Sequence, residues 1–109
     1  MATTYKVLGQ VNPASNTFTT LYTVPAATST VVSTINVCNQ SIANDTFRIA
    51  IRPGGETLVP KHYISFNTVV PAYDSISLTV GITLATTDII TVYANASTTS
   101  FNVFGSEIS

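Results

Sequence analysis

Hydrophobic and polar residues alternate with a period of two along most of the chain, which is the pattern of half-buried β-strands. The clearest alternation runs over residues 46–52, where the apolar side chains share one face and Arg48 and Arg52 share the other. A second case is 75–80, in which Ile, Leu and Val alternate with Ser and Thr. Since no segment keeps a period of 3.6 beyond a single turn, the sequence predicts a protein built from strands.

Clusters of Pro, Gly, Asn and Asp separate the strands at intervals of roughly 10–12 residues, a spacing typical of an antiparallel sandwich or barrel. We therefore predict one all-β domain over 1–109, an antiparallel β-sandwich of about eight strands. Both a jelly-roll and an immunoglobulin-like order fit this pattern. Pro60 limits the fifth strand to a sheet edge or to a later start. The predicted strands are 4–10, 16–24, 30–38, 46–52, a short strand within 57–67, 75–80, 89–95 and 100–104.

The aromatic residues are ten Phe and Tyr, without Trp. The five phenylalanines are predicted to lie in the core: Phe18, Phe47, Phe66, Phe101 and Phe104. Three tyrosines fall on predicted outer faces or turns: Tyr63, Tyr73 and Tyr93. Exposed tyrosines suit protein interfaces and also the stacking of sugars. We favour the protein interface, because sugar-binding platforms usually add Trp and several acids or amides.

Charge is scarce in this chain. Only nine of the 109 residues are charged and the net charge is −1, against a typical charged share of about a quarter. Low surface charge removes a usual safeguard against association at sheet edges. The sequence therefore predicts a surface that is partly covered by other protein. It gives no basic stripe for nucleic acid and no polybasic cluster for a membrane, so neither is expected as a partner.

No arrangement of residues typical of catalysis stands out. A Ser-His-Asp set is formally available from His62 with Asp74 or Asp88, but the chain lacks the Gly-x-Ser-x-Gly elbow. One His and one Cys are too few for a zinc site, and a single cysteine excludes an internal disulfide. The acidic residues stand singly in turns, where Asp commonly accepts hydrogen bonds from nearby backbone. We expect no enzyme activity, no cofactor and no metal.

Two arginines give the sharpest candidate for a contact surface. Arg48 and Arg52 lie four residues apart on the outward face of one predicted strand, and Lys61 lies nearby if the next strand pairs with it. The plain interpretation is a solvated face. The alternative is a patch that binds an acidic partner surface, since Arg forms bidentate pairs with carboxylates. With the tyrosines, the candidate partner-contact residues are Arg48, Arg52, Lys61, Tyr63, Tyr73 and Tyr93.

Segments in the two ends of the chain carry a family resemblance: 5–10, 21–26 and 32–39 near the start, and 81–84, 88–94 and 100–108 near the end. Together they resemble small virion structural proteins of tailed bacteriophages, especially those infecting cyanobacteria and marine bacteria. The resemblance implies a β-sandwich subunit of the particle, assembled in the host cytoplasm, on the capsid or in tail or fibre parts. It carries no catalytic residues.

Three hypotheses for the function follow. The leading one is a capsid decoration, or cement, protein that binds the major capsid protein as a dimer or trimer, with 1–4 and 106–109 as extensions toward a neighbour. Edge strands could add β-augmentation with a capsid arm. The second is a tail, fibre or baseplate component that engages the host surface near 39–44 and Tyr73. The third is a free carbohydrate-binding module or small hydrolase, which the missing Trp and the missing acid pair disfavour.

Overall fold

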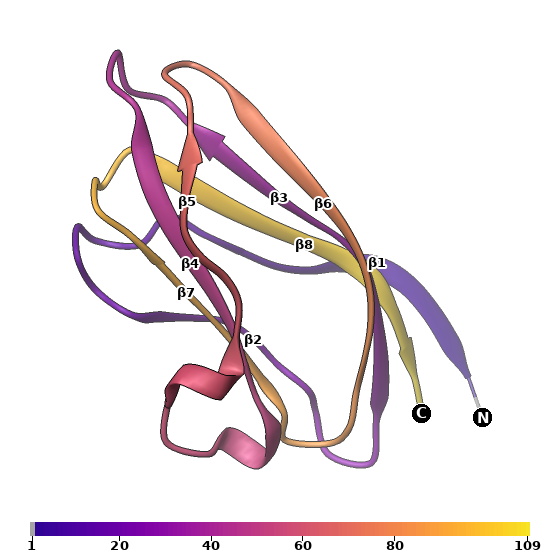
Figure 1. Ribbon diagram of the computed structural model, residues 1–109. Coiled ribbons are helices and arrows are strands. Elements are labelled where there is room, and N and C mark those ends of the chain that lie inside the picture. Colours follow the sequence, from indigo (N-terminus) through magenta and orange to yellow (C-terminus); the bar gives the residue numbers. More distant parts are fainter. Residues whose placement is uncertain (1) are drawn as a thin grey trace.

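The computed structural model describes residues 2–109, which form eight β-strands and two short 3₁₀ turns (Figure 1). No helix in this range is long and apolar enough to cross a membrane. The prediction of an all-β chain of about eight strands is confirmed. The elements are β1 (Thr3–Val11), β2 (Thr19–Thr23), β3 (Ser29–Asn39), β4 (Asp45–Arg52), η1 (Pro53–Gly55), η2 (Pro60–His62), β5 (Tyr63–Val70), β6 (Ser75–Leu84), β7 (Ile89–Ala94) and β8 (Thr99–Ile108).

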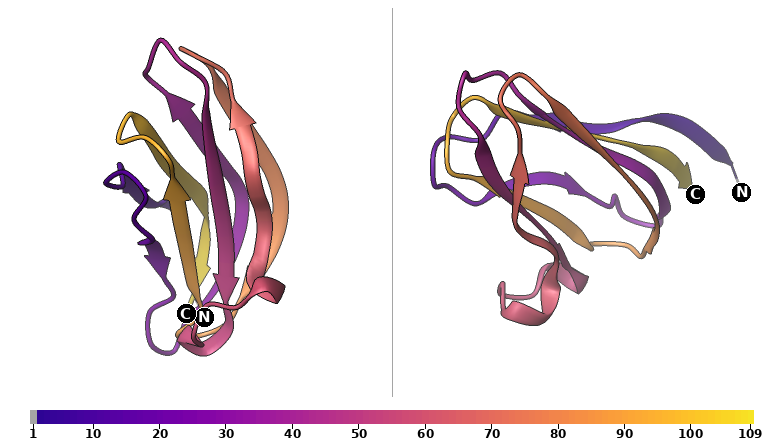
Figure 2. Two further views of the ribbon diagram at one scale, coloured as in Figure 1. Left: turned by 60° about the vertical axis from the view of Figure 1, so that its left-hand side comes forward. Right: turned by 45° about the horizontal axis from the view of Figure 1, so that its top comes forward.

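The strands form two antiparallel four-stranded sheets (Figure 2). The first sheet has the order β1-β8-β3-β6 and the second has the order β2-β7-β4-β5. Strands therefore pair as nested partners, β1 with β8, β2 with β7, β3 with β6 and β4 with β5. This nesting is the jelly-roll arrangement. The structure thus selects the jelly roll over the immunoglobulin-like sandwich. β5 lies at a sheet edge and begins after Pro60, as that proline requires.

The hydrophobic core lies between the two sheets. Phe47 and Phe101 are fully buried at its centre, where their rings meet edge to face with centroids 6.0 Å apart. Full burial of one such side chain contributes about 1.5–3 kcal/mol, so the core is the main source of stability. The other core residues come from both sheets and their connections: Leu21, Tyr22, Val24, Val32, Ile35, Val37, Ile49, Val70, Leu84, Ile90, Val92, Ala94 and Val103.

A buried carboxylate ties β4 to the turn between β7 and β8. Asp45 is almost fully buried, and its oxygens accept hydrogen bonds from the Thr46 N–H at 2.8 Å and the Ala96 N–H at 3.2 Å. The Thr99 hydroxyl donates a third bond at 2.5 Å. Because a buried charge is stable only when its oxygens are satisfied, these bonds fix the end of the sandwich at which Asp45 lies.

A tyrosine joins the two sheets at the other end. The Tyr22 hydroxyl of β2 donates to Glu107 Oε2 of β8 at 2.5 Å and lies 2.8 Å from the Thr30 hydroxyl. Burial, together with the bond to Glu107, raises the pKa of Tyr22 to about 12. The Tyr22 bond, helped by the Lys6 ammonium 3.1 Å away, lowers the pKa of Glu107. The charged carboxylate is therefore the form that the folded state stabilises.

The last strand is longer than predicted. β8 continues through Gly105 to Ile108 and pairs with both β1 and β3. Gly105 was expected to end the strand. Gly105 instead lies inside β8. A glycine is required at this position because β3 passes so close that a Cβ would overlap the Val31 carbonyl oxygen. The expectation that 106–109 forms a free extension is therefore wrong. The other expected extension, 1–4, is also wrong for 2–4, which pair with 107–109, and Met1 lies outside the described residues.

Candidate binding surface

Five side chains form a continuous row across the outer face of the second sheet. The Phe18 and Tyr93 rings lie 4.6 Å apart, centroid to centroid. The Arg48 guanidinium lies 4.8 Å from the Tyr93 ring centroid and 4.3 Å from that of Phe66. The Phe66 and Tyr63 rings meet edge to face at 4.9 Å. We call this row the arginine–aromatic strip.

The strand register explains the order of the strip. Arg48 of β4 lies directly opposite Tyr93 of β7. On its other side the register between β4 and β5 shifts, so that the single residue Arg48 faces both Phe66 and Asn67. Asn67 has φ 52°, a left-handed conformation that Asn tolerates better than most residues. This β-bulge directs the Phe66 ring over Arg48 and brings the Asn67 amide beside the guanidinium.

A second bulge places Phe18 on the same face, where the sequence predicted a core residue. β2 begins at Thr19 rather than at Asn16, because Asn16 adopts φ 55° in the preceding turn. Its register against β7 then shifts at Leu21. One extra residue inverts the side-chain alternation, so Tyr22 points into the core and Phe18 points out, 44% exposed.

Two further phenylalanines that the sequence predicted to be core residues also lie on the surface. Phe66 is 55% exposed because the bulge at Asn67 inverts the alternation of β5. Phe104 is partly exposed because it alternates with the buried residues Phe101 and Val103 along β8. Only Phe47 and Phe101 of the five are core residues, as predicted.

Arg48 is held by three neighbours and keeps hydrogen-bond donors without a partner. Its Nε donates to Asn67 Oδ1 at 2.8 Å, and the Phe66 and Tyr93 rings contact its guanidinium group. Within residues 2–109, no carboxylate forms an ion pair with Arg48 and no acceptor bonds its two terminal amino groups. A planar, pre-positioned guanidinium with free donors fits a carboxylate in bidentate geometry.

Three of the six predicted contact residues therefore meet in the strip: Arg48, Tyr63 and Tyr93. The predicted outward position of all three tyrosines is confirmed. Tyr93 is further fixed by its hydroxyl, which donates to Asn16 Oδ1 at 2.8 Å. The two phenylalanines of the strip, Phe18 and Phe66, were missed as surface residues. The available signals were Asn16, two residues before Phe18, and Asn67, directly after Phe66, since Asn tolerates positive φ better than most residues.

The other three predicted residues lie apart from this row. Arg52 shares the outward face of β4 with Arg48, as predicted, but its guanidinium donates to the backbone oxygens of Glu56 at 2.7 Å and Gly55 at 3.1 Å. It therefore holds the loop between β4 and β5. Lys61 is exposed in η2, and Tyr73 is exposed in the turn between β5 and β6.

The residues considered for catalysis have structural partners. His62 is buried, with Nδ1 accepting from the Val59 N–H at 3.2 Å and Nε2 lying 3.2 Å from Glu56 Oε1. Asp74 and Asp88 accept hydrogen bonds from nearby backbone N–H groups. No group of three His, Cys, Asp or Glu side chains that could hold a metal ion occurs within residues 2–109.

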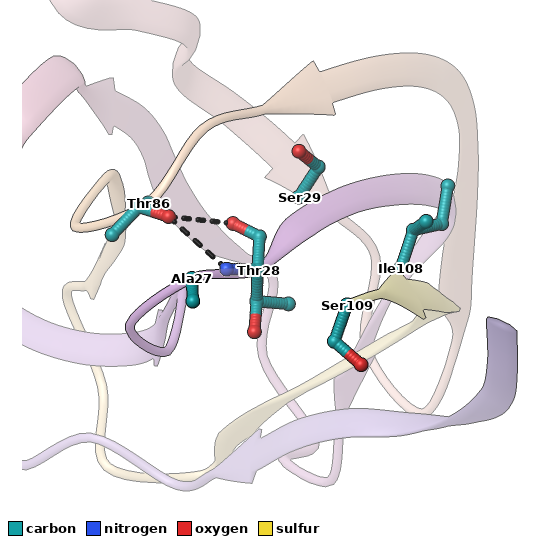
Figure 3. A pocket seen from close by; sticks show the side chains of 6 residues that line it. All are labelled: Ala27, Thr28, Ser29, Thr86, Ile108 and Ser109. Atoms are coloured by element: carbon teal, nitrogen blue, oxygen red, sulfur yellow. Dashed lines mark hydrogen bonds between the residues drawn. The ribbon is translucent and has the colours of Figure 1, made fainter. Parts of the chain in front are cut away.

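A hollow of about 430 Å³ lies at one end of the sandwich (Figure 3). Thr86 Oγ1 donates to the Thr28 carbonyl at 2.8 Å and accepts from the Thr28 N–H at 3.2 Å, as the dashed lines show. The hollow is lined by hydroxyl and aliphatic side chains, which supply neither a charge nor a general base. Its lining residues are Ala27, Thr28, Ser29, Thr86, Ile108 and Ser109.

No family model and no curated protein matches the chain. Among solved structures, it is similar to a chain in the structure of infectious bursal disease virus, Gx strain. The match has a TM-score of 0.48 and 16% sequence identity, and it covers 97% of this chain and 30% of the viral one. The chain thus spans less than a third of the length of that neighbour.

Proposed function

We propose that the chain is a virion structural protein that attaches to a larger protein lattice through the arginine–aromatic strip. The observation that carries the proposal is the free guanidinium fork of Arg48, held between the Phe66 and Tyr93 rings on the outer face of the second sheet. Aromatic residues and Arg are enriched at the buried centres of protein interfaces, where they carry most of the binding energy. The matching partner surface is an apolar groove with one carboxylate.

The specific assignment we favour is a decoration protein on the major capsid protein of a tailed bacteriophage. The resemblance of its terminal segments to phage virion proteins supports this assignment. The sparse charge supports it too, because contacts with few ion pairs weaken little as salt rises. A lattice also multiplies weak contacts, since linked subunits bind with a high effective concentration.

The test is binding of the purified chain to capsids that lack it, measured by co-sedimentation at increasing salt. We expect saturable binding that weakens only a few-fold between 50 mM and 500 mM NaCl, because about one ion pair per subunit is involved. Arg48→Ala and Phe66→Ala should each weaken it by roughly 30-fold or more, the effect of losing an interface hot spot of about 2 kcal/mol.

Tyr73→Ala is the matched control, because it also removes an exposed aromatic residue but lies outside the strip. It should leave capsid binding unchanged. Absence of wild-type binding at every salt concentration would reject the capsid assignment. Binding that neither Arg48→Ala nor Phe66→Ala weakens would reject the strip as the contact.

A second candidate function has its own observation. The turns between β3 and β4 and between β5 and β6 lie side by side, joined by the Tyr73 N–H to the Ser41 oxygen at 3.0 Å. Tyr73 and Ile42 are the exposed apolar side chains there, 71% and 79% accessible. This loop end is where a tail or fibre component would engage a host surface. Copy number distinguishes the two: hundreds per particle favour decoration, whereas six or twelve favour the tail.

A further inference from the structure

The free edge of β1 carries backbone groups without a partner in the sheet. Ala2 and Ser109 exchange two backbone hydrogen bonds, of 2.7 and 2.9 Å. Antiparallel strands alternate between pairs that exchange such bonds and pairs that do not. The backbone groups of Thr4 and Lys6 therefore also bond to β8, Thr4 to Glu107 and Lys6 to Gly105. The residues that direct both N–H and C=O away from the sheet are Thr3, Tyr5 and Val7.

This edge is regular over 3–7, up to the bulge at Leu8. The other three sheet edges are interrupted within the strand: β2 by a bulge at Leu21, β5 by Asn67 at φ 52° and β6 by Gly81 at φ 57°. Such interruptions are the usual protection of edges against pairing with other chains. The edge of β1 offers an unbroken template over 3–7, and the edge of β6 offers one of the same length over 75–79, so the side chains beside each edge decide between them.

The side chains beside this edge are apolar and exposed. Tyr5 is 84% and Val7 46% accessible, and Val7 lies directly opposite Phe104 on the outer face of the first sheet. Tyr5, Phe104 and Val31 line a shallow hollow of about 460 Å³ on that face. The one charge of the segment, Lys6, is paired with Glu107 of its own chain. Neither uncompensated charge nor proline protects the edge.

We propose that a second copy of this chain pairs with β1 along this edge, antiparallel, about a two-fold axis at Tyr5. Tyr5 then faces the partner's Tyr5, and Thr3 faces the partner's Val7. Each hydrogen-bonded pair exchanges two bonds, so the three pairs form about six. The two first sheets become one continuous sheet of eight strands. The occupant is a second copy because the same three residues satisfy one another through the two-fold axis.

The neighbouring registers fit less well. A two-fold axis at Lys6 would set two lysines directly opposite each other, which is unfavourable. An axis at Thr4 would leave Val7 without a partner inside the regular segment. With the axis at Tyr5, Lys6 faces the partner's Thr4, which in turn lies opposite Glu107 of its own chain. Each lysine thus has a carboxylate of its own chain and one of the partner in reach, so the charges complement each other.

The geometry also bears on binding to a lattice. A two-fold axis normal to the joined sheet leaves both second sheets on the same side, so the two arginine–aromatic strips face one direction. The two chain ends lie next to each other, at the ends of β1 and β8 (Figure 1, Figure 2). The pair would bind a lattice bivalently. This last consequence rests on the proposed function, whereas the pairing itself does not.

Sedimentation equilibrium of the full chain tests the pairing. We expect a concentration-dependent species of twice the 11.5 kDa chain mass. Tyr5→Pro should abolish it, because Pro blocks the free edge while the bonds to β8, made by Thr4 and Lys6, remain. Tyr5→Lys should weaken it by about tenfold or more through like charges set opposite each other. Thr79→Lys is the control: it adds the same charge to β6, at the opposite edge of this sheet, and should keep the dimer.

Cysteine cross-linking tests the register. In a Cys38→Ser background, Tyr5→Cys should oxidise to a disulfide-linked dimer, since facing residues of this kind lie about 5.5 Å apart, Cα to Cα. Lys6→Cys should cross-link much more slowly. A chain that stays monomeric up to millimolar concentration would overturn the pairing, as would a dimer that survives both Tyr5→Pro and Tyr5→Lys. A monomer that still binds capsids would refute the pairing and leave the proposed function standing.

Discussion

Alkaline destabilisation through Tyr22 is the prediction that the structure quantifies best. The folded state raises the pKa of this hydroxyl from 10.0 to about 12, because the side chain is buried and donates to Glu107. Between these two pH values the unfolded chain has lost the proton and the folded chain keeps it, so stability must fall as pH rises. Two pH units correspond to about 2–3 kcal/mol. The loss begins near pH 10 and is complete near pH 12.

Urea unfolding at pH 8 and at pH 11.5 measures this loss. Tyr22→Phe should be less stable than wild type at pH 8 by about 1–2 kcal/mol, because the buried Thr30 hydroxyl and Glu107 lose a partner. Its stability should then fall less steeply with pH than that of wild type. Tyr73→Phe controls for the ionisation of exposed tyrosines and should follow wild type. Equal pH dependence in Tyr22→Phe and wild type would refute the role of this hydroxyl.

Three further outcomes follow from single contacts, each measured by thermal or urea unfolding. Asp45→Ala should lower the free energy of unfolding by roughly 3 kcal/mol, because the buried donors that bond to Asp45 lose their acceptor. Replacing the exposed turn residue Asp74 by Ala should cost less than about 1 kcal/mol. Gly105→Ala should lower it by about 2 kcal/mol or more, since the new Cβ meets the Val31 carbonyl; an unchanged melting temperature would contradict the close approach. Because the fold lowers the pKa of Glu107, its contribution to the free energy of unfolding is present above about pH 4.5 and is lost on further acidification. Glu107→Gln should therefore lose less stability than wild type as the pH falls below that value.

The sequence pattern located the strands because the alternation of a half-buried strand is local. Over 46–52 and 75–80 no bulge interrupts β4 or β6, and the predicted inward and outward faces are correct. The predicted faces were wrong in β2 and β5, where bulges occur at Leu21 and Asn67. One extra residue in a strand moves every following side chain to the opposite face of the sheet. The strand order was also beyond reach, since it depends on pairings between residues distant in sequence.

Only part of the candidate site could be predicted, because local alternation shows which residues point outward but not which strands lie side by side. Arg48, Tyr63 and Tyr93 could be recognised as outward residues from their own strands. That they meet Phe18 and Phe66 depends on register across four strands, which no single segment records. The local hints in the sequence were Asn16 and Asn67, because Asn tolerates positive φ and therefore favours turns and bulges.

Electron cryomicroscopy of capsids with and without the added chain tests the central proposal most directly. The proposal predicts new density on the head at regular lattice positions, with the β2-β7-β4-β5 sheet toward the capsid surface and Arg48 against a carboxylate. Density in which that sheet faces solvent, or heads that gain no density at saturating chain concentration, would contradict it.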